Sequence, residues 1–145
     1  LAYAGIPATH RDTNQAVTFL TGHDQTGLAP SAINWEAIAK GSPVIVMYMA
    51  MKHLAQITQN LLDAGRDADE PVAIVCNGTL ANQQVLETTL SRAAEDAAAA
   101  TLEPPAIVCV GEVVRLRAGL DWLGAIAGRS LDPDPLDLRQ ASETG

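Results

Sequence analysis

Four positions near the middle of the sequence carry side chains that could pack against a ligand. Residues 44–65 read VIVMYMAMKHLAQITQNLLDAG, and Met47, Tyr48, Met49 and Met51 include all three methionines of the chain. Thioethers are flexible and polarisable, so they fill irregular spaces in a core or beside a bound molecule. The residue types alone favour the core for Met49 and leave contact with a ligand as the alternative.

A second candidate site is the sequence Asn77-Gly78-Thr79, which follows an apolar run. Asn-Gly is a strong turn pair, and this interpretation of Gly78 holds whether or not a ligand binds. Glycine also permits a positive φ and lets a ligand approach the backbone closely. Asn77 and Thr79 would then be neighbours that can donate hydrogen bonds.

The elements that must position these residues alternate between strands and helices. We expect strand-like segments at 16–22, 43–49, 71–78, 83–90 and 104–116, and helices at 34–40, from about 50 to 64 and at 91–100. Such alternation predicts an α/β fold, and the unbroken apolar run of the second strand indicates burial on both faces, as in a parallel sheet covered by helices. Ligands in such sheets bind beyond the carboxyl ends of the strands. We therefore expect the second and third strands to be neighbours, with Met49 and Gly78 facing each other across one crevice.

Local signals mark where the helices begin and end. Asn34 is expected to cap the first helix and Gly41 to stop it. Gly65 is expected just after the end of the second helix. The apolar face of that helix consists of Met51, Leu54, Ile57, Leu61 and Leu62.

The composition is that of an acidic, soluble domain. Apolar residues make up 48% of the 145 residues, and the longest apolar run, 44–51, is too short to span a bilayer. The net charge of −8, without a Lys/Arg cluster, disfavours binding to nucleic acids and to anionic membranes. Since no secretion leader opens the chain, we expect a cytoplasmic protein. Because it starts at Leu1 rather than methionine, we expect a piece of a longer chain.

Further features bear on stability and organisation. Cys76 and Cys109 each end an apolar run and are expected to be buried free thiols, with a disulfide less favoured and no zinc site. When segments 71–78 and 104–111 are aligned, six of the eight positions carry identical residues. We prefer the explanation that two central strands of one sheet have converged on the same residues to the explanation that a unit of the chain was duplicated. Trp122 is expected to anchor a last amphipathic turn, and the acidic tail 128–145 is expected to be disordered.

Five segments, taken in order, resemble the C-terminal half of a known enzyme family. They are YAGIPATHR, VTFLTGH, VMYM, VAIVCNGT and IVCVGEVV, and the resemblance covers about residues 2–123. Together they resemble uroporphyrinogen-III C-methyltransferases, which belong to the tetrapyrrole methylases. Their order and intervals make the match specific, although each segment is short. The resemblance implies that residues 1–127 are the C-terminal α/β/α-type domain of a two-domain fold, with a mixed sheet flanked by helices.

The resemblance also implies a cofactor, S-adenosylmethionine, bound in the cleft between the two domains, with S-adenosylhomocysteine as its product. In the family, the methionine of the Tyr-Met pair and the glycine of the Asn-Gly-Thr turn contact this cofactor. The corresponding residues here are Met49 and Gly78, and we add Tyr48, Asn77 and Thr79 as neighbours. A thioether suits the adenine, and peptide groups freed at a strand end suit the purine edge. With the resemblance, cofactor contact is the favoured interpretation of Met49.

The implied reaction is methylation of uroporphyrinogen III at C2 and C7, by way of precorrin-1, to give precorrin-2 for sirohaem or cobalamin. A nucleophilic pyrrole carbon attacks the sulfonium methyl group directly, and S-adenosylhomocysteine leaves, so the protein aligns the reactants and excludes water. The family's Gly-Gly-Asp loop and its proposed acid/base residues belong to the N-terminal half, and most of its Thr-Ala stretch would precede Leu1. We therefore expect no catalytic residue in this fragment and no turnover by it alone. Family members are homodimers, so we expect a homodimer.

The carboxylates of this substrate need local cations on an acidic domain. Arg11, together with His10, is therefore a candidate substrate contact, while a structural ion pair of Arg11 with Asp12 or another acid is equally open. His23 is interpreted as fixing a loop rather than transferring a proton. Glu112 is as readily structural as functional.

Two other functions stay open at this point. One is methylation of a later precorrin, because the halves of these enzymes resemble each other across substrates. The other is a noncatalytic module for dimerisation or nucleotide sensing. Cys76 is a departure from the family, since relatives often carry a carboxylate before the Asn-Gly pair. That weakens any expectation about the polarity at the end of the third strand.

Overall fold

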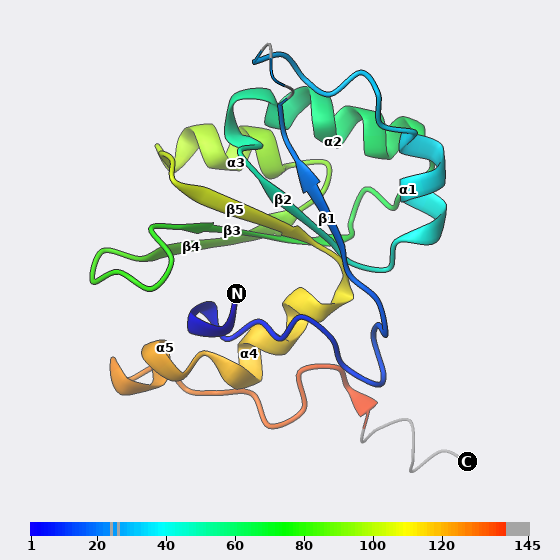
Figure 1. The fold of residues 1–145 in the computed structure, drawn as a ribbon. Helices are drawn as coiled ribbons and strands as arrows, with labels where there is room; N and C mark the ends of the chain where they lie inside the picture. Colours follow the sequence, from blue (N-terminus) through cyan, green and yellow to red (C-terminus); the bar gives the residue numbers. More distant parts are fainter. Residues whose placement is uncertain (24, 26, 139–145) are drawn as a thin grey trace.

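The computed structural model describes residues 1–23, 25 and 27–138 as a sheet between two layers (Figure 1). The strands are β1 (Thr18–Thr21), β2 (Ile45–Tyr48), β3 (Pro71–Cys76), β4 (Gln84–Thr89) and β5 (Ala106–Val110). The α-helices are α1 (Trp35–Gly41), α2 (Leu54–Asp63), α3 (Ala93–Ala99), α4 (Arg117–Leu120) and α5 (Trp122–Ile126). Three 3₁₀ helices complete the set: η1 (Ala2–Ala4), η2 (Met51–His53) and η3 (Glu112–Leu116).

The five strands form one mixed sheet in the order β1-β2-β5-β3-β4. β1 and β2 are parallel, while β5 is antiparallel to both β2 and β3, and β3 is antiparallel to β4. The mixed α/β architecture predicted for the chain is therefore confirmed. The expectation that the second and third strands are neighbours is wrong, because β5 lies between them. The parallel environment expected for the second strand exists only on its β1 side.

Alternate residues of the inner strands face two separate hydrophobic layers. One layer lies under α1, α2 and α3, and the other lies between the sheet and the N-terminal segment with η3 (Figure 1). On β2, Ile45 and Met47 enter the first layer, and Val46 enters the second. The burial on both faces that the sequence predicts for this strand is confirmed.

Helix boundaries follow the local signals. The Asn34 side chain accepts a hydrogen bond from the Ala37 N–H at 3.0 Å, so the predicted cap is present. Gly41 is the last residue of α1 rather than the residue after it. After α2, the N–H of Gly65 donates to Leu62 and that of Arg66 donates to Leu61, with φ of Gly65 at 94°. This pair of bonds is a Schellman motif, as the glycine predicts.

The last strand is shorter than the apolar segment 104–116 suggests. β5 ends at Val110, and Gly111 has a φ of 141°. A Cβ atom at Gly111 would lie 2.8 Å from the carbonyl oxygen of Pro43, so only glycine fits this turn. The chain then leaves the sheet as η3, which buries Val113 and Val114 beneath it.

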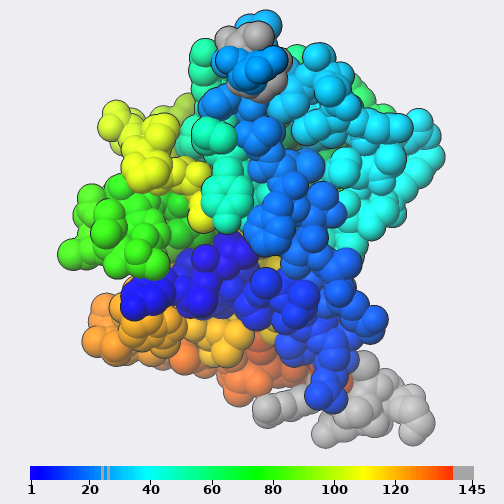
Figure 2. Space-filling view, viewed as in Figure 1, coloured from blue at the N-terminus to red at the C-terminus, as the bar shows by residue number. Residues whose placement is uncertain are grey.

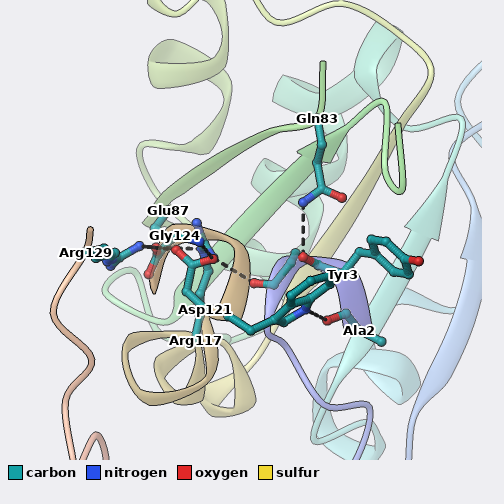
Figure 3. A network of polar contacts seen from close by, with 10 residues as sticks. Ala2, Tyr3, Gln83, Glu87, Arg117, Asp121, Gly124 and Arg129 are labelled. Atoms are coloured by element: carbon teal, nitrogen blue, oxygen red, sulfur yellow. Dashed lines mark hydrogen bonds and ion pairs between the residues drawn. The ribbon is translucent and has the colours of Figure 1, made fainter. Parts of the chain in front are cut away.

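The layer below the sheet is held together by charges as well as by apolar contacts (Figure 3). Arg117, which is buried, donates to the Ala4 carbonyl at 2.8 Å and pairs with Asp121 at 2.8 Å. Asp121 also pairs with Arg129 at 2.8 Å. These contacts join the N-terminal segment to α4 and to the residues after α5.

Trp122 anchors a helical turn, as the sequence predicts. Trp122 begins α5, packs edge-to-face on Tyr3 with ring centroids 5.4 Å apart, and donates to the Ala2 carbonyl. Residues 128–138 continue beneath α4, where the Asp132 N–H donates to the Ala118 carbonyl at 2.9 Å. Residues 139–145, the rest of the tail for which we expect disorder, lie outside the described residues. Among the residues that the structure describes, no helix is long and apolar enough to cross a membrane.

Candidate functional site

The ends of β2 and β3 lie at the same edge of the sheet. Both strands are antiparallel to β5, so they run in the same direction, and the first residues of β5 lie between their ends. Ile107 pairs with Tyr48 on one side and with Val75 on the other. Two interstrand spacings, about 10 Å, therefore separate the two strand ends. The space between them has the start of β5 as its floor.

A pocket of about 600 Å³ occupies this edge of the sheet. Most of its lining is apolar, and it is formed by His23, Tyr48, Met49, Met51, Lys52, Val75, Asn77, Gly78, Leu80, Pro104, Pro105, Ala106 and Ile107. Figure 2 shows segments near residues 50, 80 and 105, in teal, green and yellow, on one face of the molecule. The prediction that the Met49 corner and the Gly78 turn border one crevice is thus confirmed in its geometry.

Both strand ends turn through left-handed backbone. Met49 has a φ of 54°, Asn77 of 50° and Thr79 of 74°. Such values are uncommon for residues with a side chain, and they gather where a structure positions functional groups. Gly78 itself does not have a positive φ. The turn that the sequence predicts at Gly78 is present, but the positive φ that glycine would permit is adopted by its two neighbours instead.

Space, rather than backbone conformation, distinguishes Gly78. A Cβ atom placed there would meet only the Val75 side chain, at an ordinary 3.5 Å. The fold therefore tolerates a larger residue, but that residue would take up room at the pocket wall. Within the described part of the chain, no hydrogen bond engages the peptide groups of Met49 or Gly78. Such groups can be satisfied by a ligand.

The turn after β3 is braced on both sides. The Asn77 N–H donates to the Pro105 carbonyl at 2.9 Å, which ties the turn to the start of β5. The Thr79 N–H donates to the Gln83 side chain at 2.8 Å, and Gln83 donates in turn to the Tyr3 carbonyl at 3.2 Å (Figure 3). Thr79 does not line the pocket, so its part in the site is to shape the turn.

Tyr48 and Lys52 line the pocket beside Met49, while Phe19 and His53 lie outside its lining. Tyr48 is 45% exposed and stacks on Phe19, with ring centroids 6.2 Å apart. Lys52 and His53 both contact the Gly27 carbonyl, at 3.3 Å and 2.9 Å, and so join the loop after β1 to η2.

Three other candidate residues lie outside the pocket lining. The His10 Nδ1 atom lies 3.6 Å from an Asp12 carboxylate oxygen in a turn that His10 and Asn14 close. Arg11 is exposed, and none of the described acids forms an ion pair with it. Glu112 pairs with Arg115 at 2.7 Å beyond the far end of β5, which supports its structural interpretation.

The two cysteines point to opposite faces of the sheet. Cys76 belongs to the core between the sheet and helices α1–α3, and Cys109 to the core between the sheet and the N-terminal segment. Both are free and buried, so the prediction of free thiols is confirmed. Burial raises the pKa of Cys109 to about 12 and also raises the pKa of Cys76. Among the described residues, no group of three or more His, Cys, Asp or Glu side chains could hold a metal ion.

Sequence reasoning missed the floor of the pocket. Pro104, Pro105, Ala106 and Ile107 line it, although they lie 26 to 29 positions beyond Gly78. The Pro-Pro pair before an apolar run does signal the start of a strand. Its position between β2 and β3 depends on strand pairing, which no local pattern reveals.

Comparisons with known proteins point to one enzyme family. Residues 1–94 match the family model of tetrapyrrole (corrin/porphyrin) methylases. A uroporphyrinogen-III C-methyltransferase of Sinorhizobium sp. is 70% identical over 139 residues, which cover 96% of this chain and 50% of that protein. A siroheme synthase of Actinobacillus pleuropneumoniae serotype 3 (strain JL03) is 45% identical, over 85% of this chain and 24% of its own length.

A solved structure is similar in fold as well. The uroporphyrin-III C-methyl transferase of Thermus thermophilus, complexed with S-adenyl homocysteine, is 28% identical with a TM-score of 0.68. The match covers 79% of this chain and 49% of that one. The chain thus spans about half the length of the Sinorhizobium and Thermus relatives.

Proposed function

Since the chain belongs to the tetrapyrrole methylases, we propose that it forms the C-terminal half of an S-adenosylmethionine-dependent uroporphyrinogen-III C-methyltransferase. The main support is the pocket at the ends of β2 and β3, which gathers the residues that correspond to the family's cofactor contacts. The 70% identity to the Sinorhizobium enzyme supports the same assignment. The Thermus structure, which holds the demethylated cofactor, supports the choice of ligand.

The pocket suits the adenosyl part of this cofactor. Its volume of about 600 Å³ lies within the range of small-molecule sites, and its apolar lining suits a flat purine. Met49, 54% exposed, offers a thioether to the ring, and Tyr48 lies beside it. The peptide groups of Met49 and Gly78, which form no hydrogen bond with any other described residue, can bind the polar edge of the purine, while Asn77 and Thr79 shape the turn.

The bound cofactor supplies a sulfonium methyl group to a nucleophilic pyrrole carbon. This chain holds the donor in place and excludes water from one side of the reaction. We assign no proton-transfer residue to it, and we infer that it is inactive without the other half of the enzyme. Methylation at C2 and C7 would give precorrin-2, the precursor of sirohaem and of cobalamin.

A tetrapyrrole with acetate and propionate side chains requires cations. The chain carries a net charge of −8, so general attraction to such a substrate is absent. Arg11 is exposed and without an ion-pair partner among the described residues, and His10 lies next to it. We propose that these two residues contact substrate carboxylates. We also propose that the enzyme is a cytoplasmic homodimer.

Calorimetric titration with S-adenosylhomocysteine tests the cofactor site in the protein that contains both halves. Met49→Ala and Gly78→Val should each weaken binding by about tenfold or more. Ile126→Ala is the matched control for loss of an apolar side chain, because Ile126 is 79% exposed in α5 and does not line the pocket. Equal affinity of Met49→Ala, Gly78→Val and the control would refute the cofactor site.

The substrate is tested with the same protein, the cofactor and uroporphyrinogen III. We expect a red fluorescent precorrin-2-type product, and Arg11→Ala should raise KM more than it lowers kcat. Cofactor binding without this product would favour a methyltransferase for a later precorrin. Failure of the unmodified protein to bind the cofactor analogue would favour a noncatalytic module.

A further inference from the structure

We propose that Gly22 is a positioning residue of the cofactor pocket. Without a Cβ atom, it lets the end of β1 touch the peptide between Met49 and Ala50, and this contact holds Met49 in its left-handed conformation at the pocket wall. The inference rests on the proposed function, because it concerns the same pocket.

Gly22 extends the pairing of β1 with β2 by one residue. Its N–H donates to the Tyr48 carbonyl at 2.6 Å. A Cβ atom at Gly22 would lie 2.2 Å from the Ala50 Cα, 2.6 Å from the Ala50 nitrogen and 2.6 Å from the Met49 carbonyl oxygen. All three are backbone atoms, so rotation of a side chain cannot relieve the clash.

Glycine is required at position 22 by the close contact with the peptide between Met49 and Ala50, and not by its backbone conformation. The φ of Gly22 is not in the left-handed region, so the backbone conformation would accept alanine. Ala50 is fully buried in the core beneath the helices, and a packed core resists displacement. Met49 is 54% exposed, and no hydrogen bond among the described residues holds its peptide groups. A Cβ atom at Gly22 would therefore displace Met49 more readily than Ala50.

Such a displacement would alter two walls of the pocket at once. His23 follows Gly22 and Met49 precedes Ala50, and both line the pocket. The left-handed conformation of Met49 is intrinsically unfavourable for a residue with a side chain. Once the contact with Gly22 is lost, Met49 is expected to relax to another conformation and to withdraw its side chain from the bound purine.

The test compares three variants in the protein that contains both halves. Gly22→Ala should weaken binding of S-adenosylhomocysteine by about tenfold. Gly41→Ala is the matched control, because a Cβ atom at Gly41 would meet nothing within 4 Å; its affinity should stay within about twofold. Leu61→Ala controls for lost stability, because Leu61 is fully buried in α2 and does not line the pocket. At temperatures where Leu61→Ala is folded, its affinity for S-adenosylhomocysteine should also lie within about twofold of that of the unmodified protein.

A second readout reports the conformation directly. The methyl NMR signal of Met49, assigned with Met49→Leu, should shift in Gly22→Ala and not in Gly41→Ala. In the unmodified protein, saturation with S-adenosylhomocysteine should slow hydrogen exchange of the Gly22 amide, because coupling between ligand and contact is reciprocal. This last measurement needs no variant, so it applies even where Gly22→Ala fails to fold.

The outcomes separate this inference from the proposed function. If the unmodified protein does not bind S-adenosylhomocysteine, the proposed function fails and the inference fails with it. If it binds and Gly22→Ala binds equally well, only the inference is overturned. The inference would also be overturned if Gly22→Ala and Leu61→Ala lost equal affinity for S-adenosylhomocysteine. It would likewise be overturned if the ligand did not change the hydrogen exchange of the Gly22 amide.

Discussion

Replacing Arg117 by methionine should destabilise this chain much more than the same change at Arg115, two residues earlier. Arg117 is 8% exposed and lies beneath the sheet (Figure 3). Its Nη1 atom donates to the Ala4 carbonyl and contacts Asp121, both at 2.8 Å. Its Nε atom lies 2.9 Å from a Glu87 carboxylate oxygen, without the geometry of a hydrogen bond. Methionine keeps an apolar stem and removes every one of these contacts.

The expected loss of stability depends on the partners that Arg117 leaves behind when it is replaced. Removing one partner of a fully buried ion pair costs about 3–5 kcal/mol. Asp121 retains Arg129 at 2.8 Å and the Gly124 N–H at 3.1 Å, so we expect about 2 kcal/mol from this source. The buried Ala4 carbonyl loses its donor, which adds about 1–2 kcal/mol. The sum of about 3–4 kcal/mol corresponds to a decrease in Tm of about 10 °C.

Arg115→Met is the control. Arg115 pairs with Glu112 at 2.7 Å, and both side chains are 55% exposed. An exposed pair contributes less than about 1 kcal/mol, so this variant should lower Tm by at most about 3 °C. Arg117→Lys, which keeps one charge, should fall between the two.

Thermal unfolding followed by circular dichroism provides the measurement, and hydrogen exchange of residues 1–6 provides a local one. Exchange there should increase in Arg117→Met, because the Ala4 carbonyl loses its anchor. If Arg117→Met and Arg115→Met unfold within about 2 °C of each other, the charged contacts do not hold this layer together and the reasoning is refuted.

Three further predictions concern pH, thiol reactivity and the pocket. Burial raises the pKa of Asp121, but hydrogen bonds from Arg117 and other donors outweigh it and hold that pKa below the usual range. This carboxylate therefore stabilises the fold above about pH 4, and the contribution is lost as the pH falls further. Urea unfolding of Asp121→Asn should show less dependence on pH in that range; an unchanged dependence would count against the network. Cys76 and Cys109, both with raised pKa, should resist iodoacetamide at about pH 8 in the native state and react in guanidinium chloride, as mass spectrometry would show. Met49→Gly relieves a left-handed residue and removes a half-exposed side chain, so Tm should stay within about 2 °C while affinity for S-adenosylhomocysteine falls; a parallel loss of both would contradict this separation.

Much of the local structure was accessible from the sequence, because its causes are local. Asn34 caps α1 with its own side chain, and Gly65 ends α2 with two short-range hydrogen bonds. The apolar run of β2 predicts its burial on both faces. The order of short segments along the chain also indicated the family, because a resemblance depends on residues and intervals alone.

The fine structure of the site depended on contacts between distant residues. Glycine is the residue that most readily permits positive φ, yet in the turn at Gly78 it is Asn77 and Thr79 that adopt it. Gly22 drew no attention in the sequence, because nothing local distinguishes a glycine whose missing Cβ makes room for another strand. Its partner, Ala50, lies 28 positions later.

The sequence by itself thus determined where most strands and helices form, the burial of β2 on both faces, and which turn and corner carry the candidate ligand contacts. Only the tertiary structure decided that β5 enters between β2 and β3, that its first residues form the floor of the pocket, and that the two strand ends stand two strand spacings apart. The physical reason is that strand pairing joins backbone groups of residues far apart in the chain. Because nearly every residue carries the same backbone groups, the residue types along the chain say little about which strands pair.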